Sequence, residues 1–192
     1  MNTNRSKFVV ALGVIVILAL IGFAVYRVIK PAAPRQTTPP LTVLDYINRD
    51  TQVRFTIEGP VTANASHNSV QIAVSRDNSI IEVLRTYANE AAFNQTFANN
   101  QAAFEDFMTA LNNAGFIKRK AKKPDSEIGA CPTGQRFIYE LIEGGNTVSR
   151  LWSSTCGDGN FNGNAATVRT LFQAQIPGYS KIAGNVNFSA QQ

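Results

Sequence analysis

The sequence predicts an α+β fold in which an N-terminal transmembrane helix precedes a two-layer domain. We expect that domain to hold an antiparallel sheet of about five strands and two helices, in the order βββα–ββα. Three observations predict this fold: an apolar run of membrane-spanning length, alternating apolar residues with the period of strands, and two later stretches with the period of helices.

The apolar run predicts a membrane anchor. From Phe8 to Tyr26 no side chain is charged or carries an amide, and a helix of this length spans about 28 Å, close to the ~30 Å hydrocarbon core of a bilayer. The run is apolar on every face, which excludes an amphipathic surface helix. Basic residues bracket it, which disfavours a buried core helix. We expect residues 1–7 to form a cytoplasmic stub and residues 8–29 to cross the lipid bilayer.

A cleaved signal peptide is the alternative to an anchor. The apolar run exceeds the usual signal-peptide core of about 7–15 residues. Pro34 follows the nearest small-residue site, Ala32-Ala33, which disfavours cleavage there. A lipid-modified N-terminal cysteine is excluded because the only cysteines are Cys131 and Cys156.

A proline-rich stretch separates the anchor from the domain. Four of the residues 30–40 are prolines, which predicts an extended spacer with a rise of about 3 Å per residue. We expect the globular domain to occupy residues 41–182 and residues 183–192 to form a flexible tail.

Periodicity places the elements of the domain. Alternating apolar and polar side chains predict a meander of three strands, joined by turns rich in Asn and Ser. The strands are expected at 53–57, 70–74 and 80–84, with turns at 64–68 and 77–78.

Two helical stripes follow the meander. Apolar residues at i, i+3, i+4 and i+7 over 104–111 predict a helix with Asn100 as its N-cap and Gly115 just past its end. A shorter helix is expected over 168–176, before a Pro-Gly stop. We interpret both stripes as core rather than as cofactor or partner contacts.

A hairpin is predicted between the two helices. Alternating residues over 137–141 and 148–152 flank a Gly-Gly pair, and such a two-residue loop makes Glu143 face Asn146. Cys131 and Cys156 then lie at the open end of this hairpin, within reach of the Cα separation of about 5.5 Å that a disulfide needs. We predict a disulfide between these cysteines, with two free thiols as the alternative.

The cysteines also decide the orientation of the domain. Basic residues on the two sides of the apolar run are nearly balanced, and their count leans slightly toward a cytoplasmic domain. The short N-terminal stub and the disulfide argue the other way, because disulfides persist in oxidising compartments. We expect a single-pass protein of the cell membrane with its C-terminal domain extracytoplasmic.

The net charge of +5 is concentrated locally. Four of the 18 basic residues flank the apolar run, which leaves 14 basic against 13 acidic residues in the rest of the chain, where the positive charge is concentrated in one basic run. That run comprises Lys118, Arg119, Lys120, Lys122 and Lys123. We interpret it as a solvated loop, with contact to an anionic polymer or to lipid headgroups as the functional alternative. Nucleic acid is not expected as a partner, because no aromatic residue is interleaved in the run.

The sequence offers no motif for catalysis or for a cofactor. The only histidine, His67, lies in what we predict to be an exposed turn, without the motif of a triad or a metalloprotease. Carboxylates are scattered, and Glu58, Glu82 and Glu140 fall on strands whose pairing the sequence does not specify. We therefore predict no catalytic residues and no cofactor.

One stretch matches half of a calcium-binding loop. Asp158, Asn160 and Asn162 provide oxygen ligands at alternate positions before a glycine. The final position, which needs a bidentate acid, is occupied by Arg169. We interpret the stretch as a turn that caps the second helix, and we predict no metal site.

Several short segments together resemble a known group of proteins. They are Gly129-Ala130-Cys131-Pro132-Thr133-Gly134, Tyr139-Glu140-Leu141, Leu151-Trp152-Ser153, Cys156-Gly157 and Gln175-Ile176-Pro177-Gly178-Tyr179. Behind an anchor and a proline-rich spacer, they resemble uncharacterised small single-pass envelope proteins of small-genome candidate-phylum bacteria. The resemblance implies a bacterial envelope setting and no particular activity. The sequence thus predicts an envelope module that binds an envelope protein or anionic polymer, or has a structural role. The alternative is a hydrolase-like envelope enzyme whose carboxylates assemble only in the fold.

Overall fold

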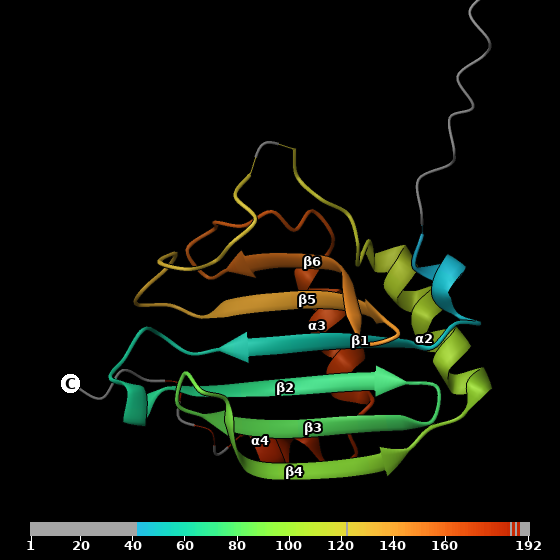
Figure 1. The fold of residues 1–192 in the computed structure, drawn as a ribbon, viewed down its shortest axis with the longest axis horizontal. Helices are drawn as coiled ribbons and strands as arrows, with labels where there is room; N and C mark the ends of the chain where they lie inside the picture. Colours follow the sequence, from blue (N-terminus) through green and yellow to red (C-terminus); the bar gives the residue numbers. More distant parts are fainter. Residues whose placement is uncertain (1–41, 122, 185, 187, 189–192) are drawn as a thin grey trace, which may run out of the picture. The chain divides into compact units, whose positions relative to one another are not determined.

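A computed structural model describes residues 42–121, 123–184, 186 and 188. These residues form an α+β domain with a six-stranded antiparallel sheet in the order β4-β3-β2-β1-β5-β6, and the helices lie on one face of it (Figure 1). The strands are β1 (Thr51–Glu58), β2 (Asn68–Ser75), β3 (Asn78–Arg85), β4 (Glu90–Ala98), β5 (Arg136–Glu143) and β6 (Asn146–Ser154). The helices are α2 (Gln101–Ala114), α3 (Ala165–Ala174) and α4 (Tyr179–Ala183), and the 3-10 turns are η1 (Val43–Tyr46) and η2 (Asn64–Ser66).

The predicted meander and hairpin are confirmed. Strands β1, β2 and β3 pair in chain order, and β5 pairs with the free side of β1, so that Phe55 lies between Ile72 and Tyr139. In the β5–β6 hairpin Glu143 faces Asn146, as predicted. A bulge between Leu141 and Ile142 then shifts the register by one residue, which the Gly-Gly loop alone does not indicate.

Strand β4 is absent from the sequence prediction, so the sheet has one strand more than expected. Its residues, EAAFNQTFA, contain a single β-branched side chain, and almost all of them are exposed. Apolar alternation marks a strand only where one of its faces is buried. Strand β4 lies at the sheet edge and buries little, so it carries no such signal.

Helices α2 and α3 form the second layer, and they pack against the sheet through aromatic side chains. Phe172 of α3 packs on Phe55 at a centroid distance of 5.5 Å, and Phe107 of α2 meets Phe172 edge-to-face at 5.2 Å. All three side chains are buried, which confirms that both helical stripes belong to the core. Burying an aromatic side chain contributes about 1.5–3 kcal/mol through removal of apolar surface from water.

The helix ends follow the predicted signals. Asn100 accepts the Ala103 N–H at 3.0 Å at the start of α2, and Gly115 ends it with φ of 75°. Asn164 accepts the Thr167 N–H at 3.0 Å, so the Asn/Gly turn does cap α3. Each cap satisfies a backbone group that the helix itself leaves without a partner.

The termini of the domain differ in how far the structure describes them. The stub, anchor and spacer expected at residues 1–40 lie outside the described residues, and within the described part of the chain no helix is long and apolar enough to cross a membrane. At the other end, Val186 and Phe188 are half-buried against the core. The folded domain therefore continues past residue 182, where the sequence analysis places its end.

Candidate functional site: a charge ladder under a disulfide-linked loop

Paired charges cross the face of the sheet that lies opposite the helices, which we call the open face. Side chains on β1, β5 and β6 alternate between the core and this face, and charged residues from all three strands gather there. We call this cluster the charge ladder. Its members are Arg54, Glu58, Glu127, Arg136, Glu140 and Arg150.

Three strands contribute the centre of the charge ladder. Glu140 of β5 lies opposite Arg54 of β1 on one side and Arg150 of β6 on the other. Arg54 Nη1 is 3.3 Å from Glu140 Oε2, and Arg150 Nε is 3.4 Å from Glu140 Oε1. Both oxygens of this carboxylate thus face a guanidinium group, and such cross-strand pairs of opposite charge stabilise a sheet.

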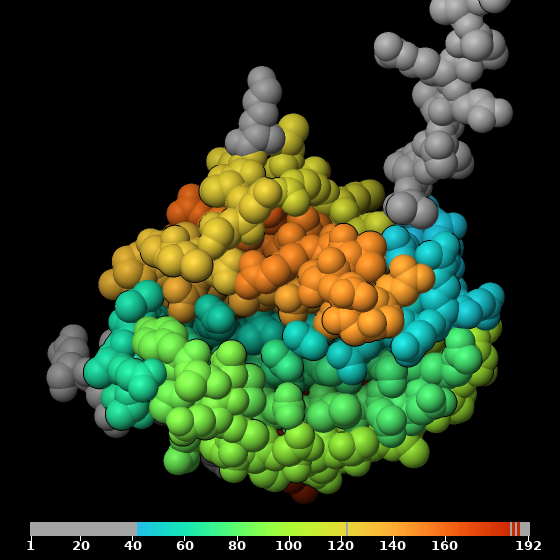
Figure 2. All heavy atoms as spheres, in the orientation of Figure 1, coloured from blue at the N-terminus to red at the C-terminus, as the bar shows by residue number. Residues whose placement is uncertain are grey.

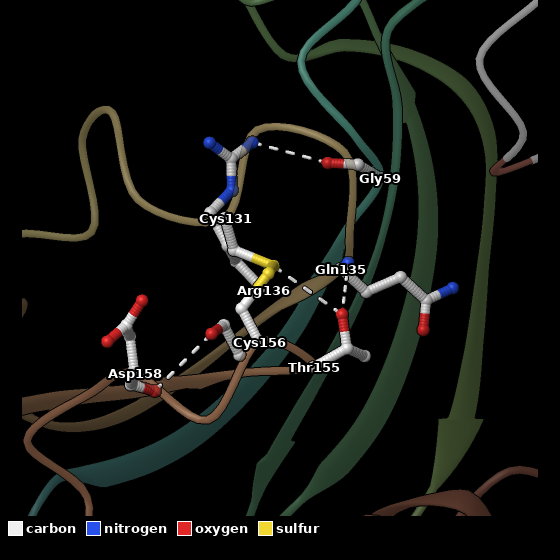
Figure 3. Close-up of a disulfide and its surroundings, with 8 residues drawn as sticks. Gly59, Cys131, Gln135, Arg136, Thr155, Cys156 and Asp158 are labelled. Carbon is white, nitrogen blue, oxygen red and sulfur yellow. Dashed lines mark hydrogen bonds between the residues drawn. A yellow bond between two sulfur atoms is a disulfide. The ribbon is translucent and has the colours of Figure 1, made fainter.

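A second pair lies at the end of β1. Arg136 Nη2 is 3.1 Å from Glu58 Oε2 and donates to the Gly59 carbonyl at 3.3 Å (Figure 3). Burial raises the pKa of the Glu58 carboxyl, the positive charge of Arg136 opposes this rise, and the negative charge of Glu127 adds to it.

Glu127 reaches the charge ladder from the segment 118–135 between α2 and β5, which we call the covering loop. Its two carboxylate oxygens accept from Arg150 Nη1 and Nη2 at 2.6 and 2.5 Å. Burial acts to raise the pKa of Glu127, but the hydrogen bonds from Arg150, a backbone hydrogen bond and the positive charges of Arg150 and Arg136 together outweigh it, so the pKa is lowered. The bidentate pair therefore holds a buried carboxylate in its charged form.

Two further contacts fix the covering loop to β6. Trp152 is 1% exposed, and its Nε1 donates to the Pro124 carbonyl at 3.1 Å. Cys131 and Cys156 form the predicted disulfide, with an S–S distance of 2.06 Å and a Cα–Cα distance of 5.6 Å. Figure 3 shows Thr155 beside this disulfide, where its hydroxyl accepts the Gln135 N–H at 3.0 Å.

Two of the three calcium-loop residues, Asp158 and Asn160, hydrogen-bond to the backbone of β6. Asn160 is fully buried, and its Oδ1 accepts the Trp152 N–H at 2.8 Å. The Phe161 N–H donates to the Trp152 carbonyl at 3.0 Å, and the Asp158 carbonyl accepts the Ser154 N–H at 3.0 Å. Within the described residues, no group of three or more His, Cys, Asp or Glu side chains is arranged to hold a metal.

The basic run lies in the first part of the covering loop. The Asn162 N–H donates a hydrogen bond to the Lys118 carbonyl at 2.9 Å, and Arg119 forms an ion pair with Asp125. The side chains of Lys118, Arg119 and Lys123 are exposed, and Lys120 is half-buried. Lys122 lies outside the described residues, and contact of this run with an anionic partner stays a prediction.

The prediction that His67 lies exposed is wrong. Its side chain is 3% exposed and stacks on Tyr87 at a centroid distance of 4.0 Å. Burial lowers the pKa of His67 and the positive charge of Arg136 lowers it further, against a hydrogen bond to the Pro60 backbone. Tyr87 comes from the turn after β3, so the stacking is a tertiary contact that the local sequence does not reveal.

The fold brings together three carboxylates, those of Glu58, Glu127 and Glu140, and each forms an ion pair with an arginine. General acid–base catalysis needs a carboxyl group that can exchange a proton with a substrate. Here each carboxylate is occupied by an ion pair with a guanidinium group. Three surface cavities of about 280, 260 and 320 Å³ have other residues in their walls, and none of the three carboxylates lines them.

The sequence does not predict most of the charge ladder. Of its members, only Glu58 and Glu140 are candidate residues on sequence grounds. The alternation of Arg54 with core residues and the polar positions of the hairpin were the available signals. Their pairing depends on strand order and on the bulge, which are properties of the fold. No protein-family model matches the chain, and a comparison with curated proteins finds no significant match.

Proposed function

We propose that this chain is a membrane-anchored module of the cell envelope that binds a partner, or has a structural role, outside the cytoplasm. The disulfide carries this proposal, because a structural disulfide persists in an oxidising compartment. The apolar run at residues 8–29 provides a single-pass anchor and residues 30–40 a spacer. The resemblance to anchored envelope proteins of small-genome bacteria agrees with this setting.

Binding is favoured over catalysis by the state of the charged groups. The ladder carboxylates are neutralised by arginines, whereas the covering loop presents Ile128, which is 88% exposed, together with exposed Lys118 and Lys123. An apolar side chain in a basic loop suits an anionic polymer or a headgroup surface. A hydrolase-like enzyme, the alternative, would require one of the ladder carboxylates to leave its arginine.

Cysteine labelling in intact cells tests the orientation. Val148 on β6 is 44% exposed, so a Val148→Cys variant of the full chain offers an accessible thiol in the domain. An Asn4→Cys variant places a thiol in the predicted stub and serves as the matched control. We expect a membrane-impermeant maleimide to label V148C in intact cells and N4C only after permeabilisation. The reverse pattern would contradict the proposal.

A charge-removal experiment tests the covering loop as the anionic contact. The double variant K118Q/K123Q removes two exposed positive charges from it. The variant R85Q/K181Q removes the same charge elsewhere and serves as the control. With the full chain in detergent and fluorescent heparin as an anionic polymer probe, we expect salt-sensitive binding that K118Q/K123Q alone weakens. Equal effects of the two variants would remove the loop from the proposal.

A further inference from the structure

The outer side of β4 is an uncharged strand edge. Strand β4 ends the sheet, and no other strand of the described residues pairs with its outer side (Figure 1). In Figure 2 the yellow-green atoms of this part of the chain form most of the lower margin of the domain. After Glu90, its first residue, no charged residue occurs until Glu105 in α2. Natural edge strands are commonly protected by charges, prolines or covering segments, and an edge without them is a template for another strand.

The backbone geometry shows which groups of β4 face outward. The Asn99 N–H donates to the Asp77 carbonyl at 2.9 Å, in register with the β3–β4 ladder. Because antiparallel strands alternate between bonded and non-bonded pairs, the odd-numbered amides of β4 point toward β3. The amides of Asn94, Thr96 and Ala98 therefore point away from the sheet. This stretch is regular, because the bulge in the pairing lies before it, between Val83 and Leu84.

The side chains of β4 divide between the two faces of the sheet. Phe93, Gln95 and Phe97 lie opposite Val83, Ile81 and Ser79 respectively, so they share the helix side of the sheet. Phe93 is 40% exposed, whereas Phe97 is half-buried against the core. On the open face Asn94 donates to Glu82 at 2.6 Å.

We propose that two copies of this chain associate through β4, as antiparallel neighbours with Gln95 of one copy facing Gln95 of the other. In this register Asn94 and Thr96 of the second copy form a bonded pair, in which each backbone N–H donates to the carbonyl of the other residue. The two-fold axis repeats this pair with the copies exchanged, so backbone groups of both edges are paired. Phe93 then faces Phe97 of the second copy in a non-bonded pair, the closer kind of cross-strand neighbour.

The edge is complementary to itself in this register and not in the neighbouring ones. The outward amides belong to even-numbered residues, so the bonded pairs must join even-numbered residues of the two copies and the two-fold axis moves in steps of one residue. The two neighbouring registers place this axis at Asn94 or at Thr96. With the axis at Asn94, Phe93 faces Gln95 and Phe97 faces Ala91; with the axis at Thr96, Phe97 faces Gln95 and Phe93 faces Asn99. Only the axis at Gln95 pairs aromatic with aromatic at both sites and brings no like charges together.

Charge substitution at Gln95 tests this interface without altering the core, because Gln95 is exposed. Like charges directly opposite each other weaken strand pairing, so we expect Q95K and Q95E each to weaken dimerisation of the full chain in detergent by about tenfold or more. Mixing Q95K with Q95E should restore the dimer. The control Val148→Lys places the same charge on β6 and should leave the dimer intact. The measurement is analytical ultracentrifugation with the detergent contribution subtracted.

A cysteine at the two-fold axis provides a second readout that does not depend on charge. Non-bonded neighbours have Cα atoms about 4.5 Å apart, within reach of a disulfide. We expect Gln95→Cys to give a covalent dimer on a non-reducing gel and Val148→Cys to stay monomeric. A monomeric parent chain at all concentrations, no rescue in the Q95K and Q95E mixture, or crosslinking through V148C in place of Q95C would each overturn the proposal. The orientation experiment measures maleimide labelling of V148C, whereas Q95K, Q95E and Q95C measure association, so the two proposals fail independently.

Discussion

The two edges of the sheet differ in how their outward-facing backbone groups are satisfied. Along β6, the segment 158–161 forms hydrogen bonds with backbone groups of Trp152 and Ser154, and the covering loop adds a disulfide and a partly buried ion pair. Along β4, residues from Ala91 onward are uncharged, and no strand of the described chain covers the outer side. The fold itself therefore satisfies the outward groups of β6 near Trp152 and Ser154, whereas no described strand pairs with the outer edge of β4.

This contrast indicates where the domain resists local opening. The β6 edge is fixed by a covalent bond, a bidentate ion pair and a buried asparagine. Strand β4 is joined to the domain mainly through its ladder with β3, and nearly all its side chains are exposed. Elements with few buried contacts open at lower free energy, so we expect β4 amides to exchange hydrogen faster than those of β6.

Removal of the disulfide should have the largest effect on this contrast. The double variant C131A/C156A frees a loop that the disulfide closes over the whole β5–β6 hairpin, and we expect a loss of about 3–4 kcal/mol in the free energy of unfolding. Urea unfolding of the full chain, followed through the fluorescence of its single tryptophan, Trp152, measures this loss. Unchanged stability would show that the covering loop does not depend on the disulfide.

Breaking the ion pair between Glu127 and Arg150 should have the next largest effect. Glu127→Gln keeps the shape of the side chain but removes a charge-assisted pair, which we expect to cost about 1.5–3 kcal/mol. Glu82→Gln on the β4 side of the open face is the matched control and should change stability by less than about 0.5 kcal/mol. Equal losses in the two variants would remove the difference between the edges.

Close packing at Gly159 offers a sharper test of the β6 edge. A Cβ at this position would collide with the Trp152 carbonyl and lie 2.6 Å from Ser153 Cα, and Gly159 has φ of +131°. Gly157 also has a positive φ, of +85°, but its Cβ position is open. We expect Gly159→Ala to destabilise the domain by about 1–3 kcal/mol more than Gly157→Ala. Similar melting temperatures for the two variants would argue against tight contact at this edge.

Protonation of His67, on the β4 side of the sheet, should destabilise the domain at mildly acidic pH. We expect this to be the smallest of the stability effects. Burial lowers the pKa of His67, so the folded state binds its proton less readily than the unfolded chain. Stability from this residue is complete above the ordinary histidine pKa of about 6.5 and falls as the pH drops below it. His67→Phe keeps a ring against Tyr87 and should abolish the loss between pH 7 and pH 5.5. Thermal melts of both proteins across this range check the prediction.

Local signals account for the parts of the fold that the sequence predicts correctly. Alternation around Phe55, the cap at Asn100 and the Gly-Gly loop each depend on a few neighbouring residues. The disulfide followed from the hairpin because its two cysteines flank one supersecondary unit. Predictions of this kind need no knowledge of which strands lie side by side.

The missed features depend on long-range contacts. Strand β4 has exposed side chains and hence no alternation, and it is identified only by its pairing with β3. His67 becomes buried through Tyr87, which the β3–β4 turn carries to it. Glu127 joins the charge ladder because the disulfide and Trp152 draw the covering loop over the sheet.

The position of the disulfide also bears on how the domain survives damage. The bond links Cys131 before β5 to Cys156 after β6, so the hairpin is part of a closed covalent ring. Its turn at Gly144-Gly145 is exposed. A protease that cuts this turn would therefore leave the two fragments covalently joined through the disulfide, each strand still paired with its neighbour.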